Sequence, residues 1–138
     1  MTSNTKPIGV AFEDQNIIGP DFILSDSQLG YTANAQGTVT QLTDKTTAVT
    51  LNKSAGRITL SNAALAATTN VSFTLNNSFI SANDVLIVTL SGGIATAATY
   101  NCWVNSLSAG SASITLRNIS AGSLSEAVII NFALIHCV

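Results

Sequence analysis

The ionisable side chains of this chain are few and widely spaced. Its 138 residues contain one histidine, seven acids and five lysines and arginines. A serine-histidine-aspartate triad would need His136 as its base. His136 lies on an apolar, strand-like segment, and the chain has no Gly-x-Ser-x-Gly elbow to hold a nucleophile. A single histidine in such a place is more often structural than catalytic.

Paired carboxylates for glycoside hydrolysis are not indicated either. Glu13 and Asp14 are adjacent, so their side chains diverge in an extended chain. Asp84 opens an apolar segment and is interpreted as a turn residue. Glu126 follows Ser-Leu-Ser and is interpreted as a solvated loop charge. We therefore predict no catalytic residues and no enzymatic activity.

The two cysteines, Cys102 and Cys137, lie in strand-like segments with apolar neighbours. In a reducing cytoplasm such residues are usually buried thiols, although a disulfide stays possible. A metal site would need more ligands than His136 supplies. His136 and Cys137 would also point to opposite faces of a strand. The sequence predicts no metal site and no cofactor.

Nucleic-acid and membrane partners are disfavoured by charge and by segment length. Lys45, Lys53 and Arg57 make at best a weak basic cluster, against an excess of acids over the whole chain. The Ser91-Gly92-Gly93 stretch lacks the lysine of a phosphate-binding loop. The apolar run 127–134 is interrupted by Asn131 and is too short to span a bilayer. We expect no direct nucleic-acid partner and no membrane.

Trp103 is the residue that best fits ligand binding. It lies between Asn101 and Asn105 on the polar-looking face of its segment, where an exposed indole would stack on a sugar. The alternative is that Trp103 faces a second sheet or a neighbouring subunit, as large buried aromatics commonly do. We favour this alternative, and keep Trp103 as the candidate glycan contact.

The overall composition is poor in charge and rich in apolar residues. Charged residues make up 9% of the chain and hydrophobic residues 46%, with a net charge of -2. An average soluble domain carries about 25% charged residues. Low net charge weakens colloidal stability. We interpret this as a protein whose surface is partly buried between copies or against a partner. A monomer coated with Ser and Thr is the alternative.

The chain divides near Gly37. Residues 1–36 contain both prolines and four of the acids, which predicts an extended N-terminal arm. Residues 37–138 contain short apolar segments separated by turn residues, which predicts an all-β domain, an antiparallel β-sandwich or jelly-roll-like body. Strands are expected at 38–41, 47–52, 57–60, 70–76, 84–90, 99–107, 112–119 and 127–138. The segment 84–90 is apolar on both faces and is predicted to be a central strand. A helical turn is predicted at 61–66.

The body resembles a domain found in structural proteins of tailed bacteriophages. The resemblance rests on the segment 37–60, with Thr50-Leu-Asn-Lys-Ser-Ala-Gly-Arg-Ile-Thr-Leu60, on Ala64-Leu-Ala, on Val71-Ser-Phe-Thr-Leu-Asn-Asn77, and on 119–133. Such domains are similar to those of small capsid decoration (cement) proteins and of head or tail fibre modules. This family carries no catalytic residues. A short arm before one compact domain resembles decoration proteins more than fibres, which have shaft repeats.

The resemblance implies a virion structural protein, made in the host cytoplasm and placed on the capsid surface. Its partners would be the major capsid protein and itself, as a homotrimer. Apolar points of the arm are the expected capsid or neighbour contacts: Ile8, Val10, Phe12, Ile17 and Ile18. A fibre or receptor-binding module that recognises host glycans through Trp103 is the alternative. A non-viral adhesin-like domain is less favoured, because the first residues lack the apolar core of a signal peptide.

Overall fold

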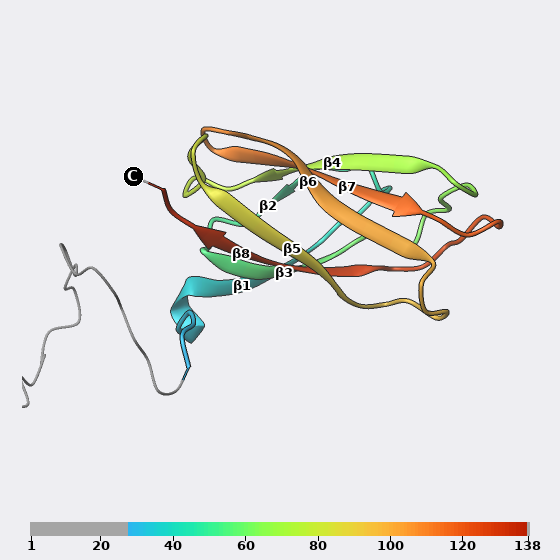
Figure 1. The fold of residues 1–138 in the computed structure, drawn as a ribbon, viewed down its shortest axis with the longest axis horizontal. Coiled ribbons are helices and arrows are strands. Elements are labelled where there is room, and N and C mark those ends of the chain that lie inside the picture. The colour runs from blue at the N-terminus through green and yellow to red at the C-terminus, as the bar shows by residue number, and fades with distance from the viewer. Residues whose placement is uncertain (1–27, 138) are drawn as a thin grey trace, which may run out of the picture.

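The computed structural model describes residues 28–137, which form a β-sandwich of two four-stranded sheets (Figure 1). A single 3-10 turn, η1 (Ala33–Ala35), precedes the strands. The described strands are β1 (Gln36–Thr40), β2 (Val49–Thr50), β3 (Ala55–Thr59), β4 (Asn70–Asn76), β5 (Val85–Gly92), β6 (Tyr100–Ser108), β7 (Ser111–Asn118) and β8 (Ile129–Ile135). The predicted all-β sandwich is confirmed.

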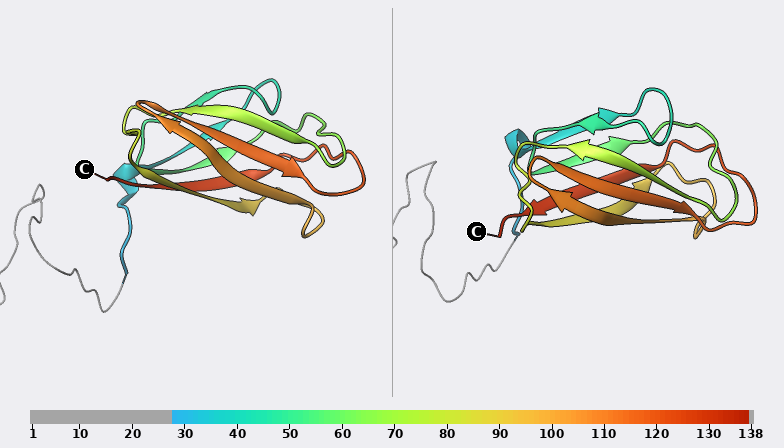
Figure 2. Two further views of the ribbon diagram at one scale, coloured as in Figure 1. Left: turned by 45° about the horizontal axis from the view of Figure 1, so that its top comes forward. Right: turned by 90° about the horizontal axis from the view of Figure 1, so that it is seen from above.

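The two sheets are mixed. Sheet A has the order β1-β3-β8-β5 and sheet B the order β2-β4-β7-β6, and they pack face to face as two layers (Figure 2). Most neighbouring strands are antiparallel, as predicted. Two pairs, β1 with β3 and β2 with β4, are parallel. In each parallel pair, chain from the other sheet lies between the two strands. Short turns alone would have given antiparallel neighbours, so the sequence did not reveal these pairings.

The core follows the two-residue alternation of the strands. In β4, Phe73 and Leu75 are buried while Ser72 and Thr74 are exposed. The corresponding inward positions of the other strands, and loop residues next to them, complete one cluster, with the residues Val49, Ile58, Leu60, Leu65, Ile80, Leu86, Tyr100, Ala112, Ile114, Leu116, Val128, Ile130, Phe132 and Leu134. Burial of these side chains is the main stabilising contribution to the sandwich.

The predicted helical turn at 61–66 is wrong. Leu65 is buried and forms an isolated antiparallel bridge with Leu124. Ser61 instead links this segment to the loop after β1, since its hydroxyl accepts a hydrogen bond from the amide of Ala63 and donates one to the carbonyl of Thr43. Tertiary packing of Leu65 therefore overrides the helix propensity of the Ala/Leu run.

The predicted central position of segment 84–90 is also wrong, because β5 lies at the edge of sheet A beside β8 alone. Its inward residues Leu86 and Val88 contribute to the core. Its outward residues Val85 and Ile87 remain 48% and 46% exposed. Apolar residues on both faces are typical of a strand that is covered on both sides, and here one side is open.

No helix among the described residues is long and apolar enough to cross a membrane.

Candidate functional site

The outer face of sheet A changes from apolar to polar along its strands. Register places Gln36, Ala55, Ala133 and Ile87 in one row across the four strands. The next row towards the far end of the sheet is Thr38, Arg57, Asn131 and Thr89. On the other side of the first row, Ile135 pairs with Val85. The sheet thus presents an apolar end and a polar end on one surface.

The apolar end gathers exposed side chains from three segments. We define the apolar patch as Leu29, Tyr31, Val85, Ile87, Ala133 and Ile135. A groove of about 370 Å³ in this patch is lined by Leu29, Gly30, Tyr31, Ala133 and Ile135. Sequence reasoning missed the patch. The signal in the sequence is the apolar pattern on both faces of β5, which by itself predicts a central strand.

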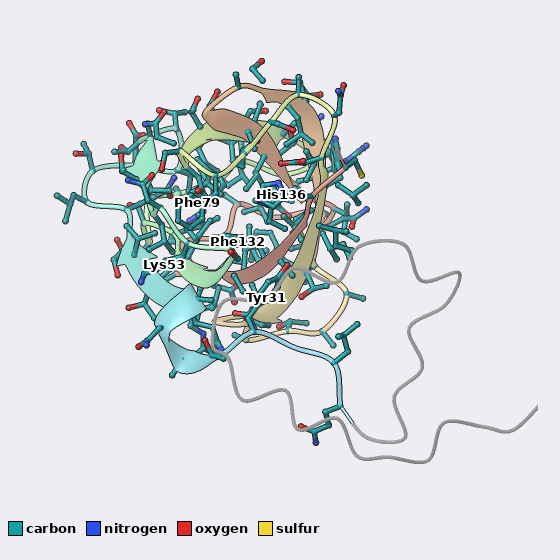
Figure 3. The ribbon with its side chains drawn as sticks, turned by 90° about the vertical axis from the view of Figure 1, so that its left-hand side faces the viewer. Tyr31, Lys53, Phe79, Phe132 and His136 are labelled. Atoms are coloured by element: carbon teal, nitrogen blue, oxygen red, sulfur yellow. The ribbon has the colours of Figure 1, made fainter. Side chains whose placement is uncertain are left out.

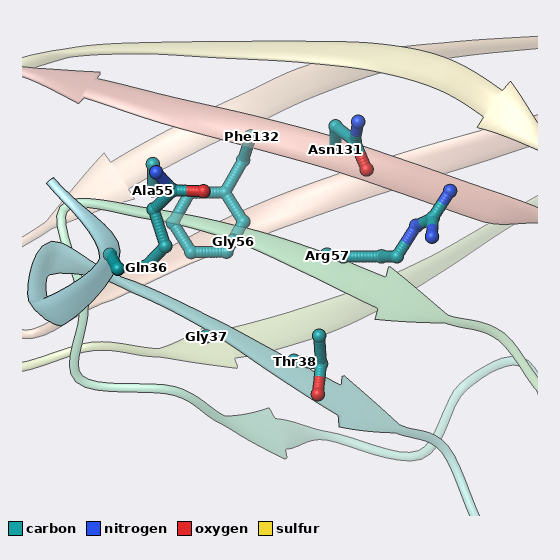
Figure 4. A pocket seen from close by; sticks show the side chains of 9 residues that line it. Gln36, Gly37, Thr38, Ala55, Gly56, Arg57, Asn131 and Phe132 are labelled. Atoms are coloured by element: carbon teal, nitrogen blue, oxygen red, sulfur yellow. The ribbon is translucent and has the colours of Figure 1, made fainter. Parts of the chain in front are cut away.

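The polar end forms a shallow hollow of about 760 Å³ over β1, β3 and β8 (Figure 4). Gln36, Thr38, Arg57 and Asn131 supply its polar side chains. Asn131 also accepts a hydrogen bond from the Ser91 hydroxyl at 2.9 Å. Arg57 forms no ion pair with any residue of 28–137. This hollow offers one guanidinium and two amides, which suits a carboxylate or a carbonyl of a partner.

The segment before β1 is fixed on sheet A at the apolar patch. The Tyr31 hydroxyl donates to the carbonyl of Leu134, and Gln36 Nε2 donates to the carbonyl of Tyr31 at 2.8 Å. Lys53 Nζ holds η1 through the carbonyl of Asn34 at 2.7 Å. Figure 3 shows Tyr31 where the described chain reaches the body, with Lys53 nearby on the side of η1. The described residues that precede β1, from residue 28 onwards, thus lie at the apolar patch.

A second polar cluster joins the end of β8 to the β4–β5 loop. Asp84 has a fully covered side chain that accepts the Ser81 amide and hydroxyl, both at 2.8 Å, and the Cys137 amide at 3.1 Å. His136 Nδ1 lies 3.0 Å from Asp84 Oδ2. The hydrogen bond from the Ser81 amide outweighs desolvation and, with the Cys137 and His136 bonds, holds the pKa of Asp84 well below its usual range. The interpretation of Asp84 as a turn residue is confirmed.

The chain leaves strand geometry after Ile135, so the prediction that His136 and Cys137 point to opposite faces of a strand is wrong. Cys137 is exposed, which corrects the prediction of a buried thiol, whereas Cys102 is half-buried and burial raises its pKa. Both thiols are free. Residues 28–137 contain no group of three or more His, Cys, Asp or Glu that could hold a metal ion.

A third cluster lies inside the body, around Lys45. The Lys45 ammonium is buried and donates to the carbonyls of Ser61 and, at 2.8 Å, Glu126. Burial lowers its pKa, against the opposing effect of the Glu126 carboxylate. Glu126 Oε1 accepts the Ala95 amide at 2.9 Å, while Oε2 is buried. Glu126 is therefore a partly buried link between loops, and its interpretation as a solvated loop charge is wrong.

The same cluster includes Tyr100, whose hydroxyl is buried without a hydrogen-bond partner among the described residues. Burial, with a further contribution from Glu126, raises the pKa of Tyr100 to about 12. The expected basic cluster of Lys45, Lys53 and Arg57 does not form, because Lys45 is buried, Lys53 holds η1 and Arg57 lies on the outer face of sheet A.

Trp103 lies on the outer face of sheet B. Its neighbours Cys102 and Val104 pack against the core, and Trp103 pairs with Thr115, whose hydroxyl is bonded to that of Ser72 at 2.7 Å. Trp103 is partly exposed. The prediction that it faces the second sheet is therefore wrong, whereas contact with a neighbouring subunit stays a prediction. The surrounding outward positions are polar: Asn70, Ser72, Thr74, Asn101, Ser113 and Arg117.

The expected arm contacts Ile8, Val10, Phe12, Ile17 and Ile18 lie outside the described residues. Comparisons with protein-family models, with curated proteins and with solved structures gave no match. The resemblance to phage structural domains stays a prediction.

Proposed function

We propose that this chain is a non-enzymatic structural protein that coats a larger protein assembly, and specifically a capsid decoration protein that binds the major capsid protein. The observation that carries the proposal is the charge content of the sandwich. The eight strands contain two charged side chains, Arg57 and Arg117. A body with nearly uncharged faces can be buried between subunits without the cost of desolvating unpaired charges.

The arm provides the attachment in this proposal. Residues Ile8 to Ile18 alternate apolar clusters with Glu13 and Asp14, and would bind the shell through buried apolar area. The body would lie across neighbouring shell subunits and oppose their separation. Depletion of charge at the centre of an interface is typical of such contacts. Three copies around a symmetry axis would hide sheet edges from aggregation.

The first test is the copy number of this chain in purified virions, measured by quantitative mass spectrometry against the major capsid protein. Decoration predicts near-stoichiometric abundance. A few copies per particle would instead indicate a fibre, and absence from virions would contradict the proposal.

A second test uses full-length variants and purified shells in a co-sedimentation assay. The double variant Ile17→Asp, Ile18→Asp is expected to lose binding, because two charges would be desolvated at the contact. The matched control Thr5→Asp, Ser3→Asp adds the same charge at polar arm positions and is expected to bind normally. Full binding by the first variant would rule out these arm contacts.

A glycan-binding module is the second candidate, and the outward position of Trp103 favours it. An indole on a polar, hydrogen-bonding face, with Arg117 as the one charged side chain among the outward strand positions around it, is suited to stacking on a sugar ring. Titration of the full chain with host surface glycans should quench Trp103 fluorescence, since Trp103 is the single tryptophan. Trp103→Ala should abolish binding measured by calorimetry, whereas Asn76→Ala at the other end of the same face should not. No binding by the unmodified chain would eliminate this candidate.

A further inference from the structure

The apolar patch on sheet A needs a covering group. Of the eight large hydrophobic side chains that are exposed within 28–137, five belong to the patch: Leu29, Tyr31, Val85, Ile87 and Ile135. Scattered exposed hydrophobics are ordinary, whereas a contiguous group marks an interaction site. The concentration of these side chains at one end of one sheet therefore indicates that another segment binds there.

The strand β5 adds an open edge to this patch. β5 hydrogen-bonds to β8 on one side and is the last strand of sheet A. Its sequence, from Val85 to Gly92, contains no charge and no proline, which are two of the usual protections of a free edge. A third protection, a bulge, is present between Leu90 and Gly92, at the end of β5 away from the patch. An edge of this composition requires cover from another part of the same protein or from another protein.

The chain itself supplies a suitable segment at a short distance. The described residues begin at Gln28, and Leu29 already lines the groove of the patch. Five positions earlier stands the apolar triplet Phe22-Ile23-Leu24, between Asp21 and Asp26. Five residues reach at most about 17 Å. Neighbouring strands are about 4.8 Å apart, so the triplet can reach every strand position of the patch.

We propose that Phe22–Leu24 binds the apolar patch of its own chain and covers Val85, Ile87 and Ile135. The short tether gives this segment an effective concentration in the millimolar range, which favours it over the same segment of a second copy. Charge on this face is complementary, because Arg57 lies one row from the patch and acids flank the triplet. The root of the arm is then fixed on sheet A, and Ile8 to Ile18 remain available for an external contact.

This inference is independent of shell binding, because it concerns the isolated protein. The test is photo-crosslinking of the full chain with p-benzoylphenylalanine in place of Phe22, followed by mapping of the products by mass spectrometry. The expected result is crosslinks to β5 and to the end of β8. The probe in place of Phe12 is the control, and is expected to give no crosslinks to the patch.

Mixing isotopically light and heavy chains separates the possible occupants. The proposal predicts crosslinks within single chains, and crosslinks between light and heavy chains would overturn it in favour of a second copy. In the probe-bearing chain, Ile87→Lys should cause loss of the crosslinks, whereas Thr89→Lys, on the same face of the same strand, should retain them. The chain that carries the probe in place of Phe22 and no other substitution is sufficient to test the proposal. If this chain gives no crosslinks to the patch, the proposal is overturned.

Discussion

Gly56 of β3 lies close to Leu51, in the loop that follows β2, and to Phe132 of β8. A Cβ atom at this position would lie 2.6 Å from Leu51 Cδ2 and 2.8 Å from Phe132 Cε1. Phe132 is buried in the core and cannot move away without disturbing its own neighbours. Figure 4 shows Gly56 on β3, alongside Phe132 of β8. Glycine is required here for space rather than for an unusual backbone conformation.

We expect Gly56→Val to lower the free energy of unfolding by about 1–3 kcal/mol, the usual cost of overpacking a core. The measurement is urea unfolding, read as a lower midpoint at an unchanged slope. Gly122→Val is the control, because a Cβ atom added at Gly122 would have open space around it, with no atom beyond its chain neighbours within 4 Å. Equal stability of the two variants would show that the side chains of Leu51 and Phe132 can shift to accommodate a side chain at position 56 at little cost.

Asp84 makes stability depend on pH in the acidic range. Its pKa in the folded protein lies well below the value of about 3.9 expected in the unfolded chain. Its stabilising contribution is therefore fully present above the unfolded pKa, and is lost as pH falls towards the folded pKa.

We expect Asp84→Asn to be less stable than the unmodified chain at neutral pH and to lose less stability on acidification from about pH 5 to pH 3. Unfolding free energies of both proteins across this range test the prediction. The difference between the two unfolding free energies at each pH cancels the contribution of the other acids, because both proteins contain those acids. Two parallel pH profiles would mean that Asp84 has an ordinary pKa.

At the scale of elements, Asn118 joins the end of β7 to two loops. Its buried Nδ2 donates to the carbonyls of Leu65, Ala66 and Gly122, at 2.9, 3.1 and 2.8 Å. Its Oδ1 accepts the amide of Ser120 at 2.9 Å. The two hydrogens of this one amide group are shared among three backbone carbonyls, and the side chain thereby holds the β7–β8 connection against the loop after β3.

We expect Asn118→Ala to lower the free energy of unfolding by about 2–4 kcal/mol, because the buried hydrogen bonds by which this side chain holds the two loops together are lost. Thermal and urea unfolding measure the change. The exposed Asn62 is the matched control, and Asn62→Ala should lie within about 0.5 kcal/mol of the unmodified chain. A small effect of Asn118→Ala would indicate that water replaces the amide.

At the scale of the whole molecule, the sandwich has almost no charge on its strands, and apolar area concentrates where the arm leaves it. Under the proposed function, shell binding would rest on apolar burial and would depend weakly on ionic strength. Co-sedimentation with shells should therefore persist at about 1 M salt, where the screening length is about 3 Å. Sulfate should strengthen binding. A steep loss of binding with salt would instead assign attachment to the acids of the arm.

The sequence alone determined the class of fold. Two-residue alternation in segments such as 70–76 requires strands, because successive side chains point to opposite faces. It placed strands at all eight observed locations, and 70–76 agrees with β4 at both ends. It also put Trp103 on the same face of its strand as Asn101, as observed, although it favoured cover of that face by the second sheet, which is wrong. These features are local, and alternation within one strand is sufficient to define them.

Only the tertiary structure decided which strands are neighbours, and with that the candidate site. The apolar pattern of β5 does not say whether its second face is covered by this body or by another segment, and the structure left that face open. The parallel pairs, the bridge of Leu65 to Leu124 and the burial of Lys45 with Glu126 likewise join residues far apart in the chain. Such contacts depend on which strands pair within a sheet and on how the two sheets stack. The alternation of side chains within one strand contains no information about either.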